Sequence, residues 1–299
     1  MDNINFTTYS PKESHIPQYY DLELALFFDG TGNNKNNIEA RRADPEAGKT
    51  VFNFANSFDS EWSNVARLWD GYDADKRIYI EGIGTEDNKS DSVYGSAFGS
   101  GATGIRAKVR KGCVELVKKM RPLLTAKENA GEQLRTLFIN VYGFSRGAAA
   151  ARNFVNEVGK SPYKGYPQSQ GDGDNSYVDD DGQLAVEEMP AAGHLGYSLQ
   201  QANIAVDSFR IRVNMLGIFD TVSSYSLLPI PQFGNDVAEL GLHNLGMADH
   251  IVHFTATDEF RKNFALTRVT RGVEKEFPGV HSDIGGSYKS GPETRNAIE

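Results

Sequence analysis

The architecture can be inferred from one segment, Leu137-Phe138-Ile139-Asn140-Val141-Tyr142-Gly143-Phe144-Ser145-Arg146-Gly147-Ala148-Ala149-Ala150. It begins as an apolar, partly β-branched run of strand length, passes through a Gly-x-Ser-x-Gly pentapeptide and continues as a helix of small residues to about Val158. A strand that turns sharply into a helix at this pentapeptide is typical of a nucleophile elbow. Glycine makes up 30 of 299 residues, so the pentapeptide alone could arise by chance. The flanking strand and helix favour the catalytic interpretation, with Ser145 as the nucleophile.

The residues around Ser145 have the sizes that such an elbow needs. A Cβ at Gly143 or Gly147 would collide as the chain reverses, and the alanines allow the helix to pack closely on its strand. The backbone N–H of Arg146, at the start of this helix, is expected to point at the oxyanion that forms when Ser145 attacks a carbonyl.

Outside this segment, apolar runs of strand length alternate with helical patterns. The other expected strands are 22–28, 77–80, 210–219 and 273–277, and the other expected helices are 63–69, 105–120 and 250–264. Residues 35–60 and 160–183 are expected to be long polar loops. This order predicts an α/β-hydrolase-like fold, with a mainly parallel, doubly wound sheet, helices on both faces and long loop insertions. Residues 1–20 are predicted to be an N-terminal arm, and 21–299 a catalytic domain that continues in a longer protein.

A serine nucleophile requires a histidine base and a carboxylate that orients it, in the chain order Ser, Asp or Glu, His. Asp220 follows an apolar strand, so we expect the sheet to present it beside the elbow. His281 lies in a glycine-rich segment after the last strand and is preferred as the base. His250 and His253, placed on the expected helix 250–264, remain the alternatives.

The first strand ends in a glycine-rich turn, Asp29-Gly30-Thr31-Gly32. A second oxyanion donor normally comes from a loop after an earlier strand. We therefore expect Gly30 and Asp29 to complete the oxyanion hole with Arg146.

Two other patterns suggest ligands but lack the required context. Gly99, Gly101 and Gly104 form a Gly-x-Gly-x-x-Gly pattern, but no strand leads directly into it, so a loop that caps a helix is preferred to a dinucleotide site. The acidic residues of the second pattern are Asp172, Asp174, Asp179, Asp180 and Asp181. Their spacing does not fit an EF-hand, and a solvated insertion is preferred to a calcium site.

Composition narrows the class of protein. The net charge of −9 argues against a general nucleic-acid binder. The single cysteine, Cys113, excludes an internal disulfide, and the N-terminus has neither the basic start nor the apolar run of a signal peptide. We expect no metal and no cofactor, since serine hydrolysis needs neither.

Five segments together resemble the catalytic domain of type VI secretion phospholipase effectors of the Tle1 type. These segments are Phe28-Asp29-Gly30-Thr31-Gly32-Asn33, Asn64-Val65-Ala66-Arg67-Leu68, Gly143-Phe144-Ser145-Arg146-Gly147-Ala148, Phe219-Asp220-Thr221-Val222 and Pro278-Gly279-Val280-His281-Ser282-Asp283-Ile284-Gly285-Gly286. The resemblance spans residues 22–288 and implies an α/β-hydrolase that uses Ser145, Asp220 and His281 on fatty-acyl esters of membrane phospholipids.

The resemblance also implies an antibacterial role. Its expected partners are membrane phospholipid as substrate, a spike protein of the secretion apparatus and a cognate immunity protein. The chain would be made in the cytoplasm and act in the periplasm of a target bacterium. Two alternatives stay open: an esterase for small soluble esters, and a non-catalytic binding module on a hydrolase scaffold.

Overall fold

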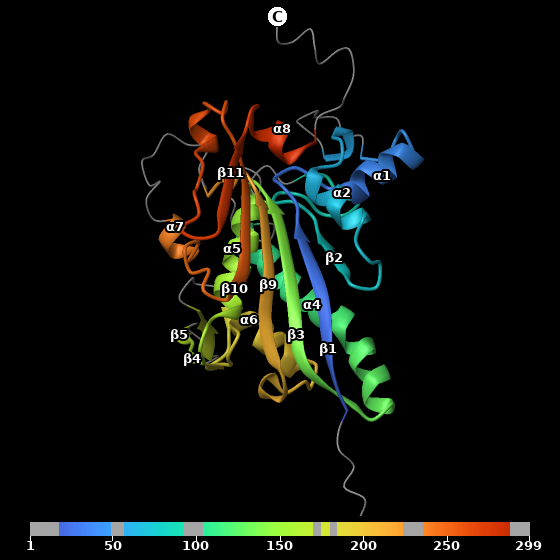
Figure 1. The fold of residues 1–299 in the computed structure, drawn as a ribbon, viewed down its shortest axis with the longest axis vertical. Coiled ribbons are helices and arrows are strands. Elements are labelled where there is room, and N and C mark those ends of the chain that lie inside the picture. Colours follow the sequence, from blue (N-terminus) through green and yellow to red (C-terminus); the bar gives the residue numbers. More distant parts are fainter. Residues whose placement is uncertain are drawn as a thin grey trace, which may run out of the picture.

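The computed structural model of the chain describes residues 18–48, 57–91, 104–169, 175–179, 184–223 and 236–287. A six-stranded sheet lies at its centre (Figure 1). In spatial order its strands are β11 (Val273–Phe277), β10 (Ala248–Ala256), β9 (Arg210–Phe219), β3 (Glu132–Phe144), β1 (Gln18–Phe28) and β2 (Arg77–Ile80). Every neighbouring pair is parallel. The expected parallel, doubly wound sheet is confirmed.

The helices are α1 (Lys35–Ala43), α2 (Asn64–Asp70), α4 (Ile105–Asn129), α5 (Arg146–Val158), α6 (Gly193–Gln201), α7 (Asp236–Glu239) and α8 (His281–Gly285). Short 3-10 turns are η1 (Ser57–Asp59), η3 (Val206–Ser208) and η4 (Lys262–Phe264). Two small antiparallel sheets join β4 (Tyr163–Lys164) to β8 (Glu188–Met189), and β5 (Tyr166–Ser169) to β6 (Asn175–Val178) and β7 (Leu184–Ala185). The N-terminal arm lies outside the described residues, except that Gln18 to Tyr20 already belong to β1.

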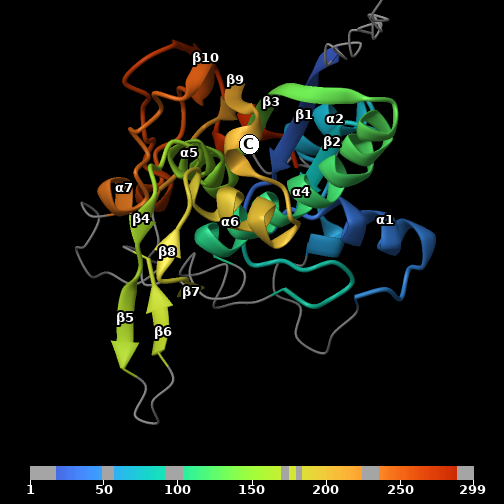
Figure 2. The ribbon, with the colours of Figure 1, turned by 90° about the horizontal axis from the view of Figure 1, so that it is seen from below.

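Successive side chains of β1 point alternately into two apolar layers, one on each face of the sheet. Leu24, Leu26 and Phe28 pack with α4 and α5 in the larger core, whereas Phe27 packs with Val65 of α2 on the other face. A strand exposes successive side chains to opposite faces, so both faces of this apolar strand are buried. Helices therefore cover both faces of the sheet, with α4, α5 and α6 on one side (Figure 2).

The chain winds outward in both directions from β1 and β3. It passes from β1 to the edge strand β2, returns to β3 on the other side of β1, and then adds β9, β10 and β11 in order. In such sheets ligands bind beyond the carboxyl ends of the strands at the point where the winding reverses. The elbow and the turn after β1 both lie at this point.

Segment 250–264 is expected to be a helix, but its first part, to Ala256, belongs to β10, and its last three residues form η4. Its apolar residues happen to lie at helical spacing, but hydrogen bonding to β9 on one side and β11 on the other decides its conformation. Tertiary pairing overrides the local pattern here. His250 and His253 consequently lie on a strand of the central sheet.

Segment 35–60, expected to be a loop, contains α1 and η1, and its residues 49–56 lie outside the described residues. The side chain of Asn34 caps α1 by accepting from two backbone N–H groups. Asn37 within the helix donates to Ser57 Oγ at 2.9 Å and accepts from the Asn88 N–H at 2.7 Å. Because α1 is held by buried polar contacts more than by an apolar face, its sequence lacks the usual helical pattern.

Segment 160–183, also expected to be a loop, contains β4, β5 and β6, which project from the body of the molecule (Figure 2). Asp179 is buried in this segment and its carboxylate contacts His194 Nε2 at 3.0 Å. The other four aspartates of the acidic pattern lie outside the described residues, as do Gly99 and Gly101. In the described part of the chain, no helix is long and apolar enough to cross a membrane.

Candidate functional site

Ser145 occupies the sharp turn between β3 and α5, with φ 58° and ψ −125°. A non-glycine residue with positive φ is strained, and here the neighbours hold it in place. The Ser145 N–H donates to Phe219 O at 3.0 Å. An added Cβ would lie 2.4 Å from Gly147 O if placed on Gly143, and 2.2 Å from Asp29 O if placed on Gly147. The predicted elbow and the need for both glycines are confirmed.

Three side chains from distant segments meet at this turn. Ser145 Oγ lies 2.8 Å from His281 Nε2, and His281 Nδ1 lies 2.6 Å from Asp220 Oδ2. All three residues are at most 5% exposed. The structure thus brings together the three residues that the sequence selected, in the arrangement that a nucleophile, a base and an orienting carboxylate require.

Asp220 is held at the carboxyl end of β9. Its backbone has a positive φ of 40° and its N–H donates to Phe254 O at 2.7 Å. Its second carboxylate oxygen, Oδ1, accepts from the Ala256 N–H at 2.9 Å. Both oxygens therefore have partners, which leaves Oδ2 directed at His281.

His281 begins the short helix α8 rather than lying in an open loop. Its ring lies between Phe144, at 4.7 Å between centroids, and Phe264, at 4.8 Å. The backbone N–H of His281 donates to Glu259 Oε2 at 3.3 Å. Hydrogen bonds from Arg261 lower the pKa of Glu259 to about 2, so this carboxylate is charged at neutral pH. These contacts fix the imidazole between Ser145 and Asp220.

The ring of His253, the alternative base, contacts Thr221, the residue after Asp220. Within the described residues, no hydrogen bond joins it to Ser145, whose Oγ contacts His281 instead. His253 Nε2 accepts from the Thr221 N–H at 3.1 Å, and its Nδ1 contacts Glu274 Oε2 at 2.9 Å. Burial lowers its pKa to about 4, against the raising effect of Glu274. His253 is therefore neutral at pH 7 and supports the backbone next to Asp220, a role that the sequence pattern did not reveal. His250 is exposed on the same strand.

The turn after β1 packs directly against the elbow. Asp29 and Gly30 there were expected to supply an oxyanion N–H, yet both N–H groups have acceptors: Ile80 O at 3.0 Å for Asp29, and the Asp29 Oδ1 at 2.7 Å for Gly30. Neither amide is available as a donor in this arrangement. Thr31, which the sequence did not single out, has a buried Oγ1 without a hydrogen-bond partner.

The carboxylate of Asp29 is buried and accepts from Ser63 Oγ and Tyr79 OH, each at 2.6 Å. Burial raises its pKa, and these hydrogen bonds oppose that rise. Burial also raises the pKa of the Tyr79 hydroxyl well above its ordinary value. Asp29 thus fastens the turn after β1 to α2 and β2, which fixes the backbone of Thr31 relative to the elbow.

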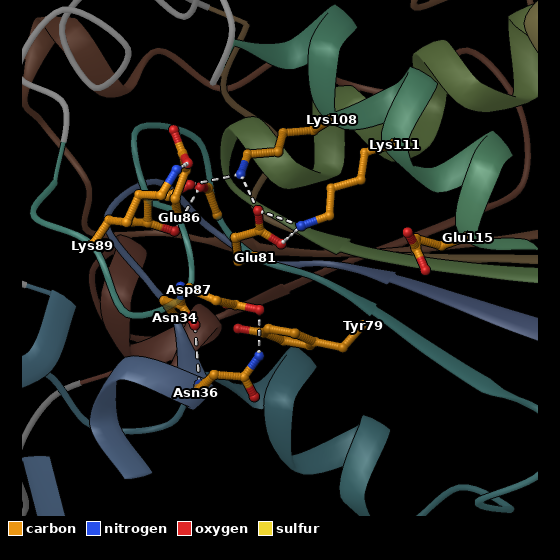
Figure 3. A network of polar contacts seen from close by, with 12 residues as sticks. Asn34, Asn36, Tyr79, Glu81, Glu86, Asp87, Lys89, Lys108, Lys111 and Glu115 are labelled. Carbon is orange, nitrogen blue, oxygen red and sulfur yellow. Dashed lines mark hydrogen bonds and ion pairs between the residues drawn. The ribbon is translucent and has the colours of Figure 1, made fainter. Parts of the chain in front are cut away.

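A second polar network supports this turn from the side of β2 (Figure 3). Asp87 accepts from Asn34 at 3.0 Å and from Asn36 at 2.9 Å, which fastens the start of α1. Glu81 accepts from Lys108 at 2.8 Å and from Lys111 at 2.6 Å, both on α4. The residues after β2 are therefore fixed to both helices. Within the described residues, no cluster of three or more potential metal ligands is present.

Comparison with known protein families identifies the family of the chain. The profile of the type VI secretion system phospholipase effector Tle1-like catalytic domain matches residues 23–298. The chain belongs to this family.

Among solved structures, the Tle1 effector bound to the VgrG spike of a type VI secretion system matches with a TM-score of 0.52 and 20% identity, covering 98% of this chain and 57% of that one. An uncharacterized protein from Pseudomonas aeruginosa matches with a TM-score of 0.47 and 21% identity, covering 92% of this chain and 42% of that one. A search among curated proteins gave no match. The family member with the spike supports the fold, and this chain spans little more than half of its length.

Proposed function

We propose that this chain hydrolyses fatty-acyl ester bonds of membrane phospholipids, as an antibacterial effector, with Ser145 as nucleophile. The observation that carries the proposal is the unbroken series of hydrogen-bonding contacts from Ser145 through His281 to Asp220 at a strained elbow. Family membership supports phospholipid as the substrate class.

The proposal assigns a role to each residue, and the contacts support it. His281 Nε2 takes the proton of Ser145 Oγ as that oxygen attacks the ester carbonyl carbon, and Asp220 stabilises the resulting imidazolium. When the tetrahedral intermediate collapses, His281 gives the proton to the departing lysophospholipid oxygen. Water then attacks the acyl-enzyme, giving up a proton to His281, and the fatty acid leaves as Ser145 is restored.

The oxyanion needs donors on the other side of Ser145. In hydrolases with a nucleophile elbow, the backbone N–H of the residue after the nucleophile is one oxyanion donor, and Arg146, the first residue of α5, occupies that position. For the second donor we propose Thr31 in place of Gly30 and Asp29. Its hydroxyl is buried and unsatisfied, and within the described residues its N–H donates to no backbone carbonyl.

Family membership also supports a delivery route and a target, which belong to the same proposal. A spike protein of the secretion apparatus would carry the chain, a cognate immunity protein would protect the producing cell, and the reaction would occur in the periplasm of a rival bacterium. The VgrG spike bound to Tle1 in the related structure supports the first of these partners.

The test compares the parent chain with Ser145→Ala on dispersed long-chain phospholipid and on short p-nitrophenyl esters. We expect the parent to release fatty acid from phospholipid and Ser145→Ala to lose on the order of 10⁴-fold in kcat. A fluorophosphonate probe should label the parent and not the variant. Hydrolysis of short esters alone would indicate an esterase for soluble substrates, whereas no labelling and no hydrolysis would indicate a binding module.

A further inference from the structure

The most exposed large apolar side chain in the described part of the chain is Phe260, at 86%. It lies in the segment between β10 and β11, beyond the carboxyl end of β10. Single apolar residues on a surface are ordinary and need no special explanation. Phe260 differs because the segment that carries it is attached to the proposed catalytic base.

We call residues 258–264 the docking tip. Three contacts fasten it to the site: Glu259 accepts the His281 N–H, Phe264 packs on the His281 ring, and Asp258 Oδ2 accepts the Gly279 N–H at 2.7 Å. The guanidinium of Arg261 lies 3.8 Å from the centroid of Phe264 and braces the tip internally. The tip is thus a supported structure, and Phe260 is directed outward from it.

Most of the charged side chains of the docking tip have partners within the protein. Glu259 pairs with Arg261 at 2.6 Å, and the Asp258 carboxylate is engaged by the backbone of Gly279. Lys262 is exposed and forms no ion pair within the described residues. The tip therefore offers a partner two exposed groups two residues apart in the chain, the Phe260 ring and the Lys262 ammonium group.

We propose that the docking tip binds the surface of a phospholipid bilayer, with Phe260 inserted at the boundary of headgroups and acyl chains and Lys262 near the phosphates. This inference rests on the proposed function, since a phospholipid ester lies just beneath the bilayer surface. Aromatic side chains insert at this depth, and the lipid phosphates attract a nearby cationic side chain. Because the tip is fastened to His281, its insertion brings the site to the depth of the ester.

The test measures binding apart from hydrolysis, with Ser145→Ala as the parent chain and vesicles of phosphatidylethanolamine and phosphatidylglycerol. In sedimentation, Phe260→Ala should bind about ten-fold more weakly, from the apolar area of one ring. Lys262→Ala should bind about five-fold more weakly, and added salt should remove that difference. Phe260→Trp should bind like the parent and be quenched by brominated acyl chains. The matched control is Tyr19→Ala, which removes a 58% exposed ring. Tyr19 lies at the amino-terminal end of β1, whereas the docking tip lies beyond the carboxyl end of β10.

The proposal would be overturned by vesicle binding of Phe260→Ala equal to that of the parent, or by equal losses from Phe260→Ala and Tyr19→Ala. A parent that does not bind vesicles at all overturns it as well. With Ser145 intact, Phe260→Ala should hydrolyse a monomeric short ester at the parental rate while losing activity on vesicles. The proposed function fails separately, if the chain with Ser145 cleaves no phospholipid even in detergent micelles.

Discussion

Replacing His253 with glutamine should make the stability of the protein less sensitive to acid. His253 is 0% exposed and its Nε2 accepts the Thr221 N–H, so it must be neutral in the folded state. Burial lowers its pKa from 6.5 to about 4. The amide of glutamine is similar in reach, can accept the same hydrogen bond and does not ionise in this range.

The sign follows from proton binding. Between pH 6.5 and about 4 the unfolded chain binds a proton at this residue and the folded chain does not, so acid favours unfolding. The contribution is absent above pH 6.5 and grows as the pH falls through this window. A shift from 6.5 to about 4 corresponds to roughly 3 kcal/mol at full development. By about pH 4.5, most of that loss, about 2 kcal/mol, should have occurred.

The assay is urea unfolding followed by circular dichroism at several pH values from 7 to 4.5. Other groups titrate in both proteins, so the useful quantity is the difference between the parent and His253→Gln. We expect the parent to lose about 2 kcal/mol more than the variant across this range. Parallel pH curves would refute the reasoning, because they would mean that the buried imidazole does not resist protonation. At neutral pH the variant should keep nearly the parental kcat, since the Thr221 N–H retains an acceptor.

Three further predictions concern the site itself. His281→Ala should reduce kcat as severely as Ser145→Ala, and the double variant should be no worse than either, because such residues act as a unit; additive losses measured by steady-state kinetics would contradict this. Thr31→Val replaces the hydroxyl with a methyl group and should lower kcat between about ten- and a hundred-fold without changing the thermal midpoint. An unchanged kcat would exclude the hydroxyl as an oxyanion donor. Gly147→Ala places a Cβ 2.2 Å from backbone and should lower the free energy of unfolding by about 2 kcal/mol or more, whereas Gly246→Ala, with nothing within 4 Å, should be tolerated in the same thermal melt.

Local physical constraints hold the backbone of Ser145 and of Asp220 in unusual conformations. The turn at Ser145 requires glycine at 143 and 147, where any Cβ would strike the backbone, and hydrogen bonds to the neighbouring strand maintain the positive φ of Asp220. Both residues lie at the carboxyl ends of adjacent strands. The sheet therefore supplies the geometry, and the turn residues supply the direction of each side chain.

Much of the fold and of the candidate site could be predicted from the sequence because the relevant constraints act between residues close together in the chain. The elbow follows from an apolar strand, two glycines and a run of alanines within fourteen consecutive residues, Leu137 to Ala150. Asp220 could be selected because it directly follows an apolar run, and parallel strands place such residues at one edge. The sequence also predicts the bounds of strands 77–80, 210–219 and 273–277.

Other features depended on contacts between residues far apart in the chain. Segment 250–264 carries apolar residues at helical spacing, yet pairing with two neighbouring strands makes its first part β10 and places His253 behind Asp220. We propose Thr31 in place of Gly30 and Asp29 as the second oxyanion donor because Ser63 and Tyr79, distant in sequence, hold the Asp29 carboxylate where it accepts the Gly30 N–H. Local sequence sets which conformations a segment can adopt, and long-range hydrogen bonds decide which donors and bases remain free to act.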